Sequence, residues 1–115
     1  MAAIKISSAK AKARRGQQWV RDRLLELFPE LAPDDVRSTP MGVTGEDVQL
    51  SPKARALFPF AIECKTKKAF SIYKEFEQAD KHKKDFPGLL FIKADRKEPL
   101  VVMSADTFFQ IWSRK

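Results

Sequence analysis

The stretch GEDVQLSPKARALFPFAIECK, residues 45–65, contains the residues that decide how this chain folds and what it does. It places Asp47 just after a glycine turn, and then Glu63 and Lys65 two positions apart in an apolar segment. Side chains alternate across a β-strand, so Glu63 and Lys65 should share one face while the apolar residues share the other. Charges on a strand otherwise suited to burial need compensation, which a divalent cation and an anionic substrate would supply.

Asp47 is predicted to lie beside Glu63. A hairpin that runs back through residues 51–59 would pair the strand that begins near Asp47 with the strand that contains Glu63. Two carboxylates on neighbouring strands can share a hard cation such as Mg²⁺, which prefers oxygen ligands and keeps several waters. Lys65 would then orient the attacking water or stabilise charge on a phosphate. The alternative is a solvated salt bridge between Glu63 and Lys65, with Asp47 serving only the turn.

The three residues, in the form GED followed by IECK, resemble the PD-(D/E)xK nuclease superfamily, and within it the small phage endonucleases and Holliday-junction resolvases. The resemblance implies that Asp47, Glu63 and the backbone carbonyl of Cys64 bind the metal, while Lys65 is catalytic. It implies Mg²⁺ as the cofactor, with Mn²⁺ as a substitute. Glu46 stands where the family has a proline before the first acid, although that proline is often missing.

Length and composition favour a single α/β domain. With 115 residues, 43% hydrophobic and 32% charged, the chain is long enough for one core and too short for two ordinary domains. We expect a basic, mobile N-terminal arm at residues 1–13 and one nuclease-like domain at 14–115. No apolar run approaches the ~20 residues that span a bilayer. We therefore expect a soluble protein with no membrane partner, in the cytoplasm of a bacterium or a phage-infected host cell.

The net charge of +7 is unevenly distributed. Residues 1–23 and residues 65–84 are strongly basic, whereas the stretch between them is acidic overall. This arrangement suits a metal-dependent enzyme acting on DNA, because basic segments hold phosphates and acids hold the ion. Solvated lysine-rich helices are common, so charge alone does not establish DNA binding. The expected DNA contacts are Lys12, Arg14, Arg15, Lys67, Lys68 and Lys74.

The hydrophobic pattern predicts the element order α-β-β-β-α-β-β-α. Helices are expected from about residue 9 to Pro29, at 70–85, and after a cap at Ser104 or Asp106; strands are expected at 36–43, after Asp47, and at 60–65, 89–93 and 100–103. Residues 51–59 are expected to form a loop. The strands joined by the middle helix should be parallel, and the hairpin strands before them antiparallel. The resulting mixed sheet flanked by helices matches the restriction-endonuclease-like αβββαβ core that the resemblance implies, plus a C-terminal strand and helix.

Two glutamines are accessory candidates. Extending the apolar face of the first helix one turn backwards reaches Gln17, with Gln18 as the alternative if the phase differs by one. The first helix of the resembled family presents a glutamate to the metal, whereas Gln17 carries no charge and is otherwise a helix-surface amide. Lys74 and Gln78 lie one turn apart on the middle helix, where the family has substrate-binding residues. The buried stripe of that helix is expected to be Ile72, Phe76 and Ala79, helped by Tyr73.

These features lead to the hypothesis of a Mg²⁺-dependent DNA endonuclease that hydrolyses phosphodiester bonds. No helix-turn-helix signature is visible, so by family analogy the substrate is recognised by its structure, such as a branch, nick or end. A junction-resolving homodimer fits this hypothesis, with Trp19 or the apolar last helix at its interface. The alternative is a non-catalytic nucleic-acid-binding subunit that keeps the nuclease fold. A third interpretation is an unrelated α/β interaction protein that binds an acidic partner.

Overall fold

The computed structural model of the chain describes residues 2–40, 45–81 and 85–113. Five strands form one mixed sheet in the order β1-β2-β3-β4-β5. Their bounds are β1 Val36–Ser38, β2 Val48–Leu50, β3 Ala61–Thr66, β4 Gly88–Lys93 and β5 Leu100–Val102. Strands β1, β2 and β3 pair antiparallel, β3 and β4 pair parallel, and β5 returns antiparallel to β4. The predicted α/β class and mixed sheet are confirmed.

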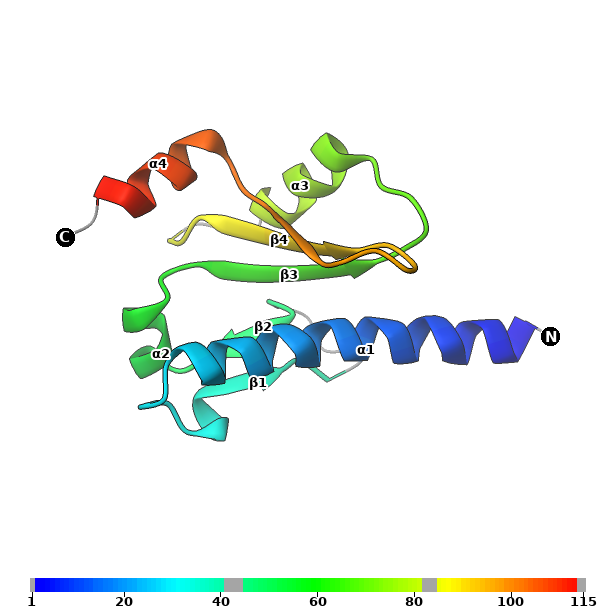
Figure 1. Cartoon of the computed structure of the whole chain (residues 1–115), viewed down its shortest axis with the longest axis horizontal. Coiled ribbons are helices and arrows are strands. Elements are labelled where there is room, and N and C mark those ends of the chain that lie inside the picture. Colours follow the sequence, from blue (N-terminus) through cyan, green and yellow to red (C-terminus); the bar gives the residue numbers. More distant parts are fainter. Residues whose placement is uncertain (1, 41–44, 82–84, 114–115) are drawn as a thin grey trace.

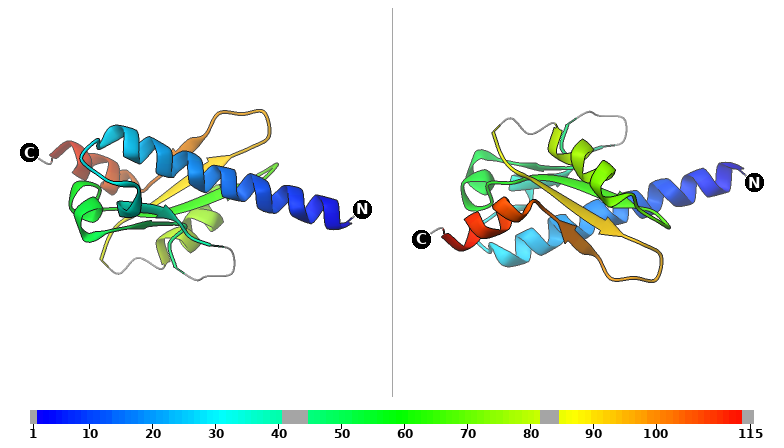
Figure 2. Two further views of the ribbon diagram at one scale, coloured as in Figure 1. Left: turned by 90° about the horizontal axis from the view of Figure 1, so that it is seen from below. Right: turned by 90° about the horizontal axis from the view of Figure 1, so that it is seen from above.

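The helices cover both faces of this sheet (Figure 1). They are α1 Ala2–Leu27, α2 Pro52–Leu57, α3 Ile72–Lys81 and α4 Ala105–Ser113, with a short 3-10 turn at Pro33–Asp35. Figure 2 shows α1 along one face, and α3 with α4 on the other side. No helix in the described part of the chain is both long and apolar enough to cross a membrane.

Helix α1 packs on the sheet through its C-terminal half. Val20 and Leu24 are buried against Val36, Val48 and Ile62. Phe28 also packs against this core, whereas Leu27 is 63% exposed. The helix already begins at Ala2, so residues 2–13, expected as an arm that turns helical only from about residue 9, have helical backbone. Their turns extend past the end of the sheet (Figure 1).

Helix α3 buries part of the expected stripe, since Phe76 and Ala79 pack on the sheet, but the rest of the stripe differs. Glu75 and Ala79 face the sheet, where Ala79 meets Leu90 and Ile92, while Ile72 is 38% exposed and Tyr73 is 87% exposed. The polar contacts of Glu75 at the start of the helix explain this rotation, because they hold its carboxylate against the sheet. The helix spans Ile72–Lys81, and residues 82–84 of the predicted helix lie outside the described part.

Two further predictions need correction. Residues 51–59 are not simply a loop, because Ser51 caps helix α2 by accepting the Ala54 N–H at 3.1 Å and Pro52 opens its first turn. Strand β1 ends at Ser38 instead of continuing toward residue 43. Proline has no N–H for a sheet ladder, which accounts for the end of the strand before Pro40. Residues 41–43 lie outside the described part.

Candidate active site

Asp47 joins strands β2 and β3. Its backbone N–H donates to the Ile62 carbonyl oxygen at 3.0 Å, and its Oδ2 accepts the backbone N–H of Cys64 at 2.7 Å. The carboxylate therefore occupies a position that a backbone acceptor would normally take between the strands. This places Asp47 beside the segment that holds Glu63 and Lys65.

The β3–β4 register fixes the faces of β3. Glu63 lies opposite Leu90 and Lys65 lies opposite Ile92. Leu90 and Ile92 belong to the core under α3, so Glu63 and Lys65 project toward the α3 side. Cys64 packs instead against the core under α1. The predicted alternation of the side chains is confirmed.

The electrostatics of Cys64 show that both carboxylates lie nearby. Burial raises the pKa of the Cys64 thiol, and the negative charges of Asp47 and Glu63 raise it further. Among the described residues, no group of three or more His, Cys, Asp or Glu side chains is placed to hold a metal ion. Asp47 and Glu63 alone would thus supply the side-chain ligands. That donor set fits Mg²⁺, which binds through one or two carboxylates and keeps waters, and does not fit zinc.

Glu75 is a site residue that the sequence analysis missed. It is 5% exposed, its Oε2 accepts the Ser71 N–H at 2.9 Å, and Lys67 Nζ forms an ion pair with Oε1 at 2.5 Å. Burial acts to raise the pKa of Glu75, but Lys67, the Ser71 bond and the charge of Lys65 outweigh it, so the pKa lies below its ordinary value. Lys65 therefore has an ionised acid nearby on α3. No capping-box spacing marks Glu75 in the sequence, because it follows Ser71 by four positions instead of three.

Glu46 and Arg55 brace the segment that presents Asp47. Both Glu46 carboxylate oxygens accept from Arg55, at 2.9 and 2.7 Å. Arg55 also donates to the Phe60 carbonyl at 2.7 Å, and its guanidinium lies 4.8 Å from the Phe86 ring centroid. Arg55, expected in a solvated loop with DNA contact as the alternative, instead links α2 to the residues before β2 and β3.

The two accessory glutamines lie on helices that cover different faces of the sheet (Figure 2). Gln17 is half-buried on α1, which covers the Cys64 face, so the sheet separates it from Glu63 and Lys65. Gln18 is half-buried on the same helix. Gln78 is exposed on α3.

The predicted DNA contacts occupy accessible positions. Arg14, Arg15, Lys67, Lys68 and Lys74 are exposed, and Lys12 is half-buried. Two of the six already have acidic partners. Lys12 Nζ lies 3.0 Å from Asp95 Oδ1, and Lys67 pairs with Glu75.

No protein-family model, curated protein or solved structure matches this chain. The geometry around Asp47, Glu63 and Lys65 therefore carries the functional interpretation.

Proposed function

We propose that this chain is a Mg²⁺-dependent DNA endonuclease, selective for DNA structure in the manner of a Holliday-junction resolvase. The observation that carries the proposal is the hydrogen bond from Cys64 N–H to Asp47, which brings the first acid to the strand of Glu63 and Lys65. Both acids also lie close enough to influence the Cys64 thiol. A pair of carboxylates beside a lysine is the minimum that metal-assisted phosphodiester hydrolysis requires.

The topology supports the same proposal. The order α1, β1, β2, β3, α3, β4 and the single parallel pair β3–β4 are those expected for a restriction-endonuclease-like core. Helix α2 is a short insertion between β2 and β3, and β5 with α4 follows the core. None of these additions interrupts the strands that carry Asp47 and Glu63.

The roles of the residues follow from their surroundings. Asp47, Glu63 and the Cys64 carbonyl would hold Mg²⁺, whose contribution when bound is Lewis-acid charge. The Cys64 N–H fixes one oxygen of Asp47 and leaves the other available. Lys65, which lies near the ionised Glu75, stabilises the negative charge that develops as water attacks phosphorus and the bond to the leaving sugar oxygen breaks.

The C-terminal elements suit the proposed homodimer. Thr107 is the one buried residue of α4 in the described part of the chain. Phe109 and Trp112 are 68% and 73% exposed, and Leu100 on the edge strand β5 is 56% exposed. Large apolar side chains exposed to solvent are candidates for a protein interface when they share one surface. Light scattering should show a dimer that Phe109→Glu converts to a monomer, and a monomeric parent protein would contradict this arrangement.

The proposal is tested by incubating the protein with linear duplex, single strand, nicked circle and four-way junction, each with Mg²⁺, Mn²⁺ or EDTA. We expect cutting with either metal, none in EDTA, and preference for the junction. Equal cleavage of all duplexes would contradict the proposed selectivity for DNA structure and still support nuclease activity. Absence of cutting on every DNA would contradict the enzyme.

The alternative function is a non-catalytic DNA-binding subunit. The observation that favours it is the position of Gln17, which is uncharged and lies across the sheet from Glu63. Such a subunit would bind the junction with the same affinity in Mg²⁺ and in EDTA and would cut nothing. The same panel of DNAs therefore separates the two functions.

A further inference from the structure

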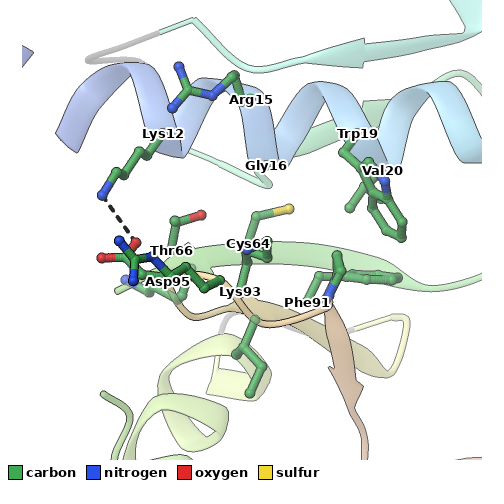
Figure 3. Close-up of a pocket in the computed structure, with 14 residues that line it drawn as sticks. Lys12, Arg15, Gly16, Trp19, Val20, Cys64, Thr66, Phe91, Lys93 and Asp95 are labelled. Atoms are coloured by element: carbon green, nitrogen blue, oxygen red, sulfur yellow. Dashed lines mark hydrogen bonds and ion pairs between the residues drawn. The ribbon is translucent and has the colours of Figure 1, made fainter. Parts of the chain in front are cut away.

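A pocket of about 330 Å³ lies between α1 and the sheet, on the face opposite to Glu63 (Figure 3). Its walls come from α1, from the C-terminal halves of β3 and β4, and from the turn that follows β4. Cys64 and Thr66 point into it from β3, and Gly16 lets α1 approach closely, since an added Cβ there would lie 3.0 Å from Thr66 Oγ1. The proposed cleavage chemistry uses no side chain from this face.

One end of the pocket is aromatic. The Trp19 side chain projects from α1 toward the sheet, and Phe91 lies on β4 at the same end of the pocket (Figure 3). Trp19 is 39% exposed although it faces a pocket, and the Arg23 guanidinium lies 5.0 Å from its ring centroid. This cation–π contact with Arg23 stabilises the orientation of the indole ring. A partly exposed, braced tryptophan beside a phenylalanine is a platform on which a nucleic-acid base can stack.

The other end of the pocket is cationic. Lys12, Arg15, Lys93 and Arg96 line it, against Asp95 as the acid. The hydrogen bond and charge of Lys12 lower the pKa of Asp95, so this carboxylate stays ionised and neutralises one cation. Three cationic side chains then remain in excess. An excess of lysine and arginine at the mouth of an aromatic pocket matches a phosphate attached to a base.

We propose that this pocket binds one unpaired nucleotide of a DNA strand, with its base at Trp19 and Phe91 and its phosphate at the cationic end. The assignment rests on the proposed action on DNA. The volume is near the lower limit of small-molecule sites, which suits one nucleotide and excludes a duplex. Strand β3, which carries Glu63 and Lys65, forms one wall of the pocket, so a nucleotide held there lies across the sheet from these two side chains. Capturing an unpaired nucleotide gives the enzyme a means of selecting branches and ends.

The test uses the fluorescence of Trp19. The chain has two tryptophans, so a Trp112→Phe background leaves Trp19 as the sole indole. A short thymidine oligonucleotide, the same strand with abasic sites, a blunt duplex of equal length and free thymidine monophosphate are titrated in EDTA. We expect saturable quenching by the thymidine strand, and affinity about tenfold weaker for the abasic strand, because stacking on the aromatic residues is lost. The duplex should quench little.

Two variants locate the effect. Arg15→Gln should weaken binding of the thymidine strand more than Arg14→Gln does, since both remove one exposed cation but only Arg15 lines the pocket. Phe91→Leu should reduce the difference in affinity between the thymidine and abasic strands, because it removes one of the two aromatic residues that contact the base. Equal affinity of the normal and abasic strands for the parent protein would overturn the proposal. Equal affinity for thymidine monophosphate and the strand would overturn the assignment to DNA.

The outcome is independent of cleavage, because the titration contains no metal. Quenching of Trp19 fluorescence without cleavage of any DNA in the panel would support nucleotide binding in the pocket and contradict the proposed nuclease activity. Cutting without Trp19 quenching would keep the nuclease and reject the pocket.

Discussion

Replacing Asp47 by alanine and by asparagine should separate its structural contribution from the catalytic role proposed for it. Oδ2 of Asp47 accepts the Cys64 N–H at 2.7 Å between two strands. Alanine removes this acceptor, and leaving a part-buried N–H without it costs about 1–3 kcal/mol. Asparagine keeps a carbonyl oxygen at the same place and loses the charge, for which we expect about 1 kcal/mol. Asp47→Ala should therefore be the less stable variant, although an ordinary domain stability of about 5–15 kcal/mol leaves it folded.

The assay is urea unfolding followed by circular dichroism, with Asp34→Ala as the control. Asp34 is an exposed acid, so its loss removes the same charge and should change the free energy of unfolding by less than about 0.5 kcal/mol. The urea dependence should be the same in all variants, because the surface exposed on unfolding is unchanged. The reasoning fails if Asp47→Ala is as stable as the parent protein, or if asparagine costs as much as alanine. Asp47→Asn is then the variant with which metal binding and cleavage are properly measured.

Three other substitutions test the surroundings of the site. The lowered pKa of Glu75 stabilises the folded protein above pH about 4.3, the ordinary glutamate pKa, and this stabilisation is lost as the pH falls through the lowered pKa. Glu75→Gln should therefore lower the urea midpoint more at pH 7 than at pH 3. An equal difference between variant and parent protein at the two pH values would contradict this. Arg55→Ala should lower the free energy of unfolding by about 2 kcal/mol, because it removes the Glu46 pair and a bond to the Phe60 carbonyl, and an unchanged urea midpoint would refute that role. Gly16→Ala should raise the free energy of unfolding by about 1 kcal/mol in a Thr66→Ala background, and by less in the parent protein, where the added Cβ meets Thr66 Oγ1. The same increase in both backgrounds would show that the contact with Thr66 does not oppose the substitution.

Much of the fold follows from patterns within single elements. The alternation around Glu63 and Lys65 predicted their shared face, and the helix between β3 and β4 predicted the parallel pair. Both are local consequences of strand geometry and of the handed crossover between parallel strands. The spacing of Val20 and Leu24 likewise located the buried side of α1.

The errors arose where polar contacts override local pattern. The apolar stripe of α3 was predicted from hydrophobic spacing, but a buried carboxylate, Glu75, takes part of it because Lys67 forms an ion pair with it and the Ser71 N–H donates to it. Helix α2 was missed because two prolines suggested a loop, although the Ser51-Pro52 pair is a helix start. The ion pair of Glu46 with Arg55 depends on how α2 meets the residues before β2, which no periodicity encodes.

The residues of the candidate site could be predicted from the sequence, but the contacts that position them could not. Asp47, Glu63 and Lys65 could be chosen from residue type and spacing. The bond from Cys64 N–H, the acid on α3 and the separation of Gln17 by the sheet follow only from the three-dimensional arrangement.

The most direct test of the central claim is the Mg²⁺-dependent cleavage rate of Lys65→Met beside the parent protein and Lys97→Met. Lys97 lies exposed in the turn after β4, so its replacement removes the same charge at a distance from the two acids. We expect a loss of about 100-fold or more for Lys65→Met, the scale expected when a charge-stabilising group is removed, and little change for Lys97→Met. Cleavage by folded Lys65→Met at the parental rate would contradict the assignment of Asp47, Glu63 and Lys65 as the catalytic site.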